Sequence, residues 1–100
     1  MKPRKNDVAV QCHISGLQLT ELQKYTDYMI EAFGLNRKIK SYKGKRSISL
    51  YSWDLDCILG VIDLSLRDTK NYPDPHSEGY LALQLLQQSL KAAYRDTYER

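Results

Sequence analysis

The pattern that decides the fold lies in residues 37–51, which read RKIKSYKGKRSISLY. Polar and apolar residues alternate on both sides of Lys43-Gly44, as they do in two strands joined by a turn. Ile39 marks the core side of the first strand, and Ile48 and Leu50 mark the core side of the second. The sequence therefore predicts a β-hairpin whose opposite side is polar, basic and tyrosine-bearing, carrying Lys38, Lys40, Tyr42, Ser47, Ser49 and Tyr51.

A further strand and a helix are predicted upstream of this hairpin. Residues 8–14 read VAVQCHI, so every second side chain would face the core and Ala9, Gln11 and His13 would extend the polar face. A helix should follow, because Thr20 and Gln23 form a capping-box pattern. Its apolar stripe would be Leu22, Tyr25, Met29 and Phe33, with Gly34 as the C-terminal stop.

Two more helices are predicted downstream of the hairpin. The apolar spacing within residues 53–67 favours a helix over a buried strand, with Ser52 as its cap and Asp54 and Asp56 near the positive end of its dipole. Residues 71–75 (NYPDP) break the chain, and the last helix begins at about Ser77. The apolar stripes of the two helices are Leu55, Ile58, Leu59, Ile62 and Leu66, then Leu83, Leu86, Leu90 and Tyr94.

Together these elements predict an α+β fold in the order β-α-β-β-α-α, with helices packed on one face of a small antiparallel sheet. The chain has 100 residues, 42% of them apolar, which is enough for one core. We expect a basic N-terminal tail over residues 1–7 and a single domain over residues 8–100. An open sheet of three strands is marginal on its own, so pairing with another copy of the chain or with a partner protein is also expected.

Composition argues against several classes of protein. No apolar run approaches the roughly 20 residues that span a bilayer, so no membrane partner is expected. The basic start is not followed by an apolar stretch, which argues against a signal peptide. Cys12 and Cys57 lack C-x-x-C spacing, which favours two reduced thiols over a disulfide or a zinc site. We therefore expect a cytoplasmic protein, or one in an organelle with a reducing interior.

Residues that carry catalysis are sparse. Histidine occurs only at positions 13 and 76, and no nucleophile, base and orienting group form a recognised motif. Glycine-rich phosphate loops, zinc-protease motifs and calcium-binding loops do not occur, so no cofactor is expected. Asp56 and Asp63 lie two helical turns apart on one face, which suits either a divalent cation in an enzyme or a solvated surface.

The distribution of charge gives the clearest functional hypothesis. The net charge is only +3, yet residues 37–46 contain six basic side chains and no acidic one. Lysine and arginine on a β-ribbon can contact phosphates, and tyrosines can stack on bases. We therefore predict non-catalytic binding of DNA or RNA through Lys38, Lys40, Tyr42, Lys43, Lys45 and Arg46, with Gln11 and His13 beside them.

Two other interpretations stay open. Lysines on an edge hairpin also discourage pairing between sheets, which would make these charges a solubility device. Alternatively, the chain is a protein-interaction or regulatory module that docks a partner through its sheet edge or the acidic helix face around Asp56 and Asp63. Salt separates nucleic-acid binding from docking, because binding dominated by phosphates weakens steeply as the salt concentration rises.

From residue 8 to about residue 93 the chain resembles the later part of a LAGLIDADG homing-endonuclease repeat. The matching pieces are a strand, a helix ending in Phe33-Gly34, a basic hairpin with Lys43-Gly44-Lys45 at its turn, an apolar helix, a Tyr72-Pro73 break and a last helix. The resemblance implies that the polar sheet face is a DNA-reading surface.

The chain also departs from the pattern of that family. The family's signature helix, which provides the metal-binding acid and the contact between repeats, should precede the first strand. Only seven residues precede Val8 here, so we expect this sequence to lack that helix. Residues 59–63 (LGVID) look like part of that signature, but a loop and another helix follow them where the family has strands. We therefore expect residues 59–63 to form core, and we expect no DNA cleavage.

Overall fold

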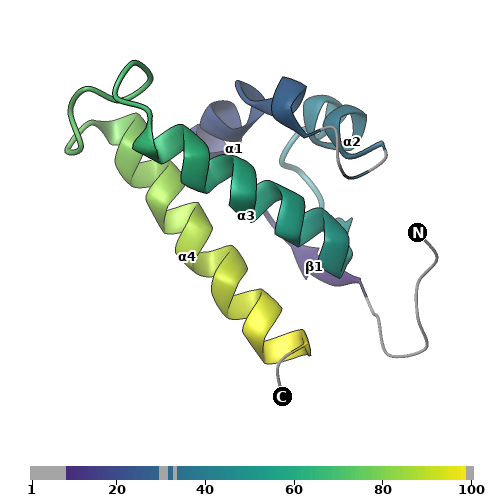
Figure 1. The fold of residues 1–100 in the computed structure, drawn as a ribbon. Helices are drawn as coiled ribbons and strands as arrows, with labels where there is room; N and C mark the ends of the chain where they lie inside the picture. Colours follow the sequence, from purple (N-terminus) through teal and green to yellow (C-terminus); the bar gives the residue numbers. More distant parts are fainter. Residues whose placement is uncertain (1–8, 30–31, 33, 99–100) are drawn as a thin grey trace.

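The computed structural model describes residues 9–29, 32 and 34–98, so the predicted tail over residues 1–7 lies outside the described residues. The α+β class is confirmed, but helices dominate and the order of strands and α-helices is β-α-α-β-α-α (Figure 1). The elements are β1 (Val10–Cys12), α1 (Gly16–Gln23), the 3-10 helix η1 (Thr26–Tyr28), α2 (Leu35–Ser41), β2 (Ile48–Leu50), α3 (Ser52–Arg67) and α4 (Glu78–Tyr98).

The sheet of the described chain consists of β1 and β2, which pair antiparallel with Gln11 opposite Ser49. Ile48 and Leu50 are buried, whereas Gln11 and Ser49 join side chains on the outer face through a hydrogen bond of 2.7 Å. The predicted division of these strands into a core side and a polar side is therefore confirmed.

The predicted hairpin is wrong, because its first arm is the helix α2. Leu35 and Ile39 are four residues apart and both are buried, which places them on one face of a helix. Gly34 adopts a left-handed conformation at φ +80° where the helix begins, a geometry that favours glycine. Within residues 37–42 the only aliphatic residue is Ile39, so its pattern fits a strand and a helix equally well, and Leu35 decides between them.

The long helix predicted after the first strand is also wrong, because α1 ends at Gln23. Thr20 does not cap it; its hydroxyl donates to the Gly16 carbonyl inside the helix, at 3.2 Å. The Thr26 hydroxyl donates to the Gln23 carbonyl at 3.3 Å, the kind of local bond that competes with helix continuation. The predicted core positions Tyr25 and Met29 are nevertheless buried, whereas Phe33 lies outside the described residues.

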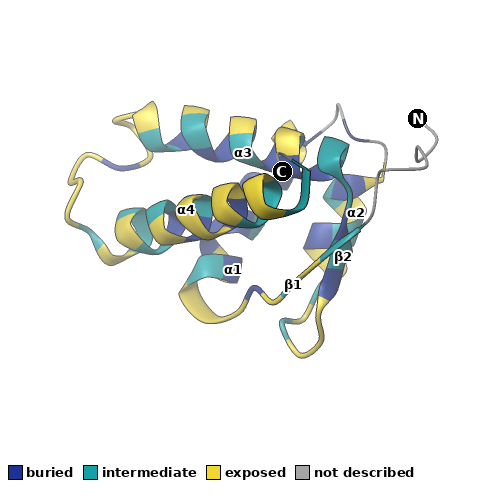
Figure 2. Ribbon diagram, turned by 90° about the horizontal axis from the view of Figure 1, so that it is seen from below, coloured by how far each residue is buried: buried dark blue, intermediate teal, exposed yellow. Residues whose placement is uncertain are grey.

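Helices α3 and α4 run antiparallel and bury the surfaces that face each other (Figures 1 and 2). The N-cap residue of α3 is Tyr51, one residue before the predicted Ser52. The Tyr51 backbone N–H donates to the buried Asp54 carboxylate at 3.0 Å. On α4, Leu83, Leu86 and Leu90 are buried as predicted, whereas Tyr94, the fourth residue of the predicted stripe, is half-buried. No helix in the described part of the chain is long and apolar enough to cross a membrane.

Candidate functional site

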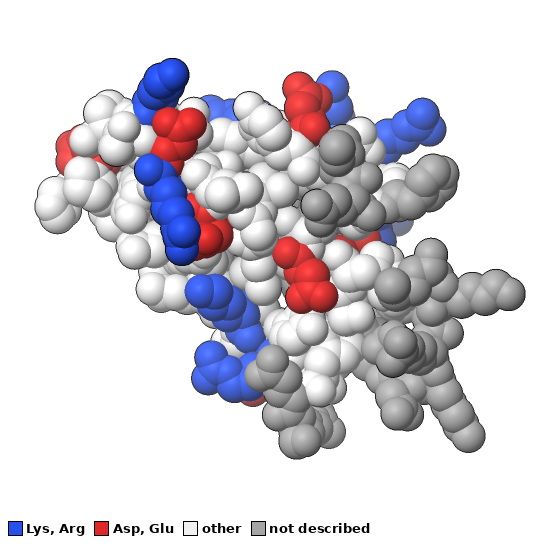
Figure 3. Space-filling view, viewed as in Figure 1, with Lys and Arg blue, Asp and Glu red and all other residues white. Residues whose placement is uncertain are grey.

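A group of cations covers α2 and the loop that follows it; we call residues 37–46 the cationic segment. In Figure 3, Lys and Arg side chains project over α2 at the upper right, with acidic atoms beside them, and further acidic side chains lie along α3. Among the described residues, none of the exposed cations of the segment makes an ion pair with an acid. These exposed cations are Arg37, Lys40, Lys43, Lys45 and Arg46.

The loop of the cationic segment is held in place by hydrogen bonds to its backbone. The His13 imidazole Nε2 lies 2.6 Å from the Gly44 carbonyl oxygen, and the Tyr42 hydroxyl donates to the Arg46 carbonyl. Gly44 has φ +78°, and a Cβ there would lie 3.1 Å from the Ile14 carbonyl oxygen. Glycine is therefore needed both for the backbone conformation and for the close approach. Because the loop backbone is fixed, the Cα atoms of its exposed cations are held in a defined arrangement.

Lys38 differs from the other lysines of the segment. It is half-buried, and its ammonium donates to the Ser49 carbonyl of β2. Because the sheet has two strands, β2 has an edge that faces away from β1, and Lys38 occupies one backbone acceptor of β2. The structure thus brings Gln11, His13 and Tyr42 to the same end of the molecule as the cations, but gives these three residues and Lys38 intramolecular partners.

The C-terminal end of α2 is completed by a side chain from α1. The Gln23 side-chain amide donates to the carbonyls of Ile39 at 3.1 Å and Tyr42 at 3.0 Å. The Ile39 carbonyl also accepts from the Tyr42 backbone N–H at 3.2 Å, so the amide adds a second donor there and supplies a donor to the Tyr42 carbonyl just after the helix. The sequence pattern had assigned Gln23 to a capping box at the start of its own helix, which is wrong.

Glu21, Tyr25 and Tyr72 form a hydrogen-bonded group in the core that we call the buried hub. Tyr25 donates to Tyr72 at 2.7 Å, and Tyr72 donates to Glu21 Oε1 at 2.7 Å. The Lys24 ammonium lies 2.8 Å from Glu21 Oε2. Every side-chain polar atom of the hub therefore has a partner, which removes the cost of burying them.

Burial and hydrogen bonding oppose each other in setting the pKa of Glu21, but both raise the pKa of Tyr72. Burial by itself raises the pKa of Glu21, but the hydrogen bonds from Lys24 and Tyr72 outweigh it, so this pKa lies below its ordinary value. Burial, with hydrogen bonds to Tyr25 and Glu21, raises the pKa of Tyr72 well above its ordinary value. Glu21 is thus ionised and Tyr72 protonated at neutral pH, an arrangement that stabilises the core.

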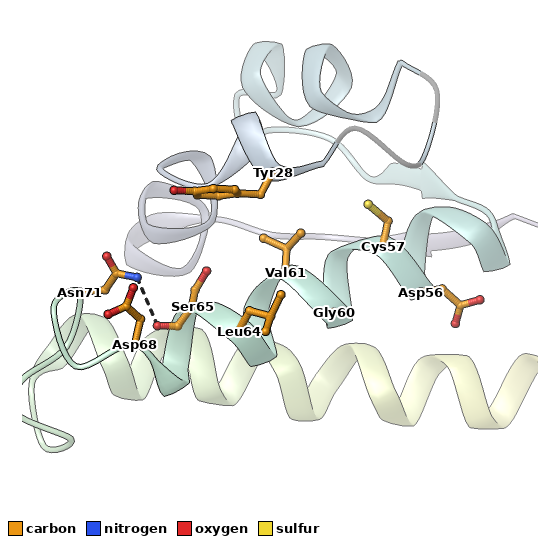
Figure 4. A pocket seen from close by; sticks show the side chains of 9 residues that line it. All are labelled: Tyr28, Asp56, Cys57, Gly60, Val61, Leu64, Ser65, Asp68 and Asn71. Carbon is orange, nitrogen blue, oxygen red and sulfur yellow. Dashed lines mark hydrogen bonds between the residues drawn. The ribbon is translucent and has the colours of Figure 1, made fainter.

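A groove of about 400 Å³ lies along the outer face of α3. The ring of Tyr28 forms its roof and Val61 points up from its floor, as Figure 4 shows. Tyr28 and Leu64 are each 69% exposed, the highest values among the large apolar residues that the structure describes. The described residues that line it are Tyr28, Asp56, Cys57, Gly60, Val61, Leu64, Ser65, Asp68 and Asn71.

The two acids that the sequence placed on one face of α3 are not brought together. Asp56 lines the groove, whereas Asp63 does not and pairs with Arg67 at 3.2 Å. Among the described residues, no three His, Cys, Asp or Glu side chains are placed to hold a metal ion. Cys12 and Cys57 are half-buried thiols, and burial raises the pKa of Cys12. The divalent-metal interpretation of Asp56 and Asp63 gains no support from this geometry.

No known protein family matches the chain, and no curated protein or solved structure is detectably similar to it. The resemblance to homing-endonuclease repeats therefore stays a prediction. One of its pieces, the basic hairpin, is replaced by α2 and a loop. No motif in the sequence indicates the groove, although Leu64 lies off the apolar stripe of α3 and is thus a candidate for an exposed leucine.

Proposed function

We propose that this protein binds nucleic acid without cleaving it, through phosphate contacts made by the cationic segment. The observation that supports the proposal is the group of five exposed cations on α2 and its loop, with no acidic residue between Leu35 and Tyr51. Local charge of one sign that is not neutralised within the protein attracts a polyanion and accelerates its association.

The fixed loop of the cationic segment should increase the affinity for nucleic acid. Lys43, Lys45 and Arg46 extend from backbone that His13 and Tyr42 hold in place. A preorganised site loses less conformational freedom on binding, so more of the electrostatic attraction is retained as affinity. The helix α2 supplies Arg37 and Lys40 next to this loop.

The contacts proposed here are sequence-tolerant. Tyr42 is half-buried and its hydroxyl already bonds the Arg46 carbonyl, so it supports the loop rather than stacking on a base. Lys38 likewise has a backbone partner in β2. What remains for the ligand is mainly lysine and arginine, which fix a protein on phosphates but carry little sequence information.

A salt titration with matched variants tests this proposal. Affinity for short duplex and single-stranded DNA and RNA is measured at several salt concentrations, with the protein and with a variant carrying Lys40→Ala, Lys43→Ala, Lys45→Ala and Arg46→Ala. If each cation contacts one phosphate, the slope of log affinity against log salt for a duplex should become shallower by about 3–4 in this variant.

Two single variants serve as controls. Lys70→Ala removes one exposed cation from the loop between α3 and α4, at the other end of the molecule from α2, and should leave the slope unchanged (Figure 1). Lys38→Ala should lower stability slightly, since it removes the bond to Ser49, and should also leave the slope unchanged. The proposal fails if none of the four nucleic acids binds, or if the quadruple variant keeps both affinity and slope.

A further inference from the structure

The groove on α3 combines apolar exposure with negative charge. Its centre is formed by Tyr28, Val61 and Leu64, and the charged residues in its lining are Asp56 and Asp68, both exposed. No lysine or arginine is among the described residues that line it, although the chain as a whole is cationic. An apolar surface with this much exposure marks an interaction site more often than an ordinary patch of surface.

We propose that this groove docks a segment of a partner protein that carries an apolar side chain between two basic residues. The apolar side chain enters between Tyr28 and Leu64, and the basic residues lie against the carboxylates of Asp56 and Asp68 at the two ends. Apolar anchors in a groove supply most of the affinity in such recognition, and charges at the rim supply specificity.

The spacing of the two acids defines the length of the bound segment. Asp56 and Asp68 are separated by twelve residues of α3 and its C-terminal end, which corresponds to about 18 Å along a helix. A helical segment would bridge this distance with about 12 residues, and an extended one with about 5. The exposed ring of Tyr28 can also receive a lysine or arginine over its face.

The negative charge of the groove favours a basic partner segment over a nucleic acid, an acidic segment or a purely apolar ligand. A nucleic acid or an acidic segment would be repelled by Asp56 and Asp68, and a purely apolar ligand would bring neither carboxylate an opposite charge. Asp63, on the same helix, is already paired with Arg67 and lies outside the lining. The inference does not rest on nucleic-acid binding, because the groove and the cationic segment have no residue in common.

Peptide binding without nucleic acid tests the groove. The probe is a helical peptide of about 12 residues, matching the roughly 18 Å span, with leucine at its centre and lysine at both ends. A second peptide has glutamate in place of each lysine. Affinity is measured by fluorescence anisotropy for the full chain and its variants, and the amide chemical shifts of Gly60 and Val61 report whether the peptide occupies the groove.

Two variants of the groove are compared with two of matched chemistry outside it. Asp56→Asn with Asp68→Asn keeps the shape and removes the charge, and should weaken binding of the lysine peptide about tenfold. Leu64→Ser should weaken it at least about tenfold. Asp63→Asn, on the same helix, and Leu85→Ser, a leucine 56% exposed on α4, should leave the affinity unchanged.

The expected set of results is binding of the lysine peptide alone, with losses confined to the groove variants. Three results would overturn the proposal: no binding of the lysine peptide, equal binding of the glutamate peptide, or equal losses in the groove variants and their controls. All the substituted side chains are largely exposed or half-buried, so a folding defect would not be expected to obscure the result.

Discussion

Both the buried hub and the cationic segment contain polar and charged side chains, but these are buried and paired in the hub and largely exposed in the cationic segment. In the hub, two tyrosine hydroxyls and a carboxylate satisfy one another inside the protein, and the exposed ammonium of Lys24 pairs with the same carboxylate. Around the cationic segment, the Tyr42 hydroxyl and the His13 imidazole bond to the backbone of the loop, and five cations of the segment extend into solvent. The side-chain polar atoms of the hub are thus already paired, whereas the cationic segment keeps its exposed charges available.

This difference separates stability from recognition. A hydrogen bond to a buried charged group contributes about 1.5–3 kcal/mol, and a buried partner that is left alone costs a similar amount. Substitutions of exposed surface residues usually change stability by less than about 0.5 kcal/mol. Changes in the hub should therefore alter the free energy of unfolding, and changes to the exposed cations should alter binding.

The largest effect on stability is expected from Tyr72→Phe. This change removes two hydrogen bonds of 2.7 Å and leaves the Tyr25 hydroxyl and one oxygen of the buried Glu21 without that partner. We expect the free energy of unfolding to fall by about 2–3 kcal/mol, measured by denaturant titration. Tyr28→Phe, which removes an exposed hydroxyl, should change it by less than about 0.5 kcal/mol.

The same variant tests whether the two regions are independent. At a temperature where Tyr72→Phe is folded, its affinity for nucleic acid and the slope of that affinity with salt should equal those of the unchanged protein. Similar unfolding energies for Tyr72→Phe and Tyr28→Phe would show that the hub contributes little. A change in the salt slope would instead show that the hub and the cationic segment are coupled.

The pH dependence of stability should show the ionised state of Glu21. Its pKa in the folded protein lies below its ordinary value of 4.5, so the ionised form stabilises the fold above that pH. This stabilisation is lost as the pH falls through the lowered pKa. Glu21→Gln should therefore be less stable than the unchanged protein at pH 7, and the gap should close as the solution is acidified below about pH 4.5.

An exposed glutamate provides the control for this pH experiment. Glu78, in the first turn of α4, is exposed. Glu78→Gln should change the stability only slightly at pH 7, through the loss of a favourable interaction with the helix dipole. A gap between Glu21→Gln and the unchanged protein that stays constant from pH 7 to pH 3 would mean that the effect of Glu21 does not depend on its charge.

The sequence was sufficient for the elements whose apolar residues repeat over several turns. The α4 stripe of Leu83, Leu86 and Leu90 spans enough residues to exclude a strand, and these residues are buried as predicted. The strand pattern around Ile48 and Leu50 was also correct. The segment around Ile39 was not, because a single apolar residue among polar ones has no period, and its helix depends on a tertiary contact of Leu35.

The sites were less predictable than the helices, for a related reason. The hub joins Glu21 and Tyr72, which are 51 residues apart, and no local pattern indicates that such residues meet. The groove depends on Tyr28, which lies in η1 where a continuous helix was expected. The cations of residues 37–46 were visible as a group, but the role of Lys38 depends on its contact with β2. Composition thus indicated a charged surface, and the tertiary structure determines which charges are available.

The smallest expected changes in the free energy of unfolding come from substitutions of two helical glycines that differ in their surroundings. A Cβ on Gly79 of α4 would lie 2.7 Å from Glu21 Oε1, whereas a Cβ on Gly60 of α3 would have no neighbour within 4 Å. Alanine in place of glycine normally stabilises a helix by roughly 0.5–1 kcal/mol. Gly60→Ala should therefore raise the free energy of unfolding by about that amount.

Gly79→Ala should instead lower the free energy of unfolding by about 1 kcal/mol, because overpacking exceeds the gain in helix propensity. The Glu21 carboxylate cannot simply rotate away from the new methyl group, since Tyr72 holds one oxygen at 2.7 Å and Lys24 the other at 2.8 Å. In a background with Tyr72→Phe one of these restraints is gone, and the penalty of Gly79→Ala should shrink. Equal stabilisation by both alanines, measured by denaturant titration, would show that the carboxylate moves freely and that the hub is not a rigid part of the core.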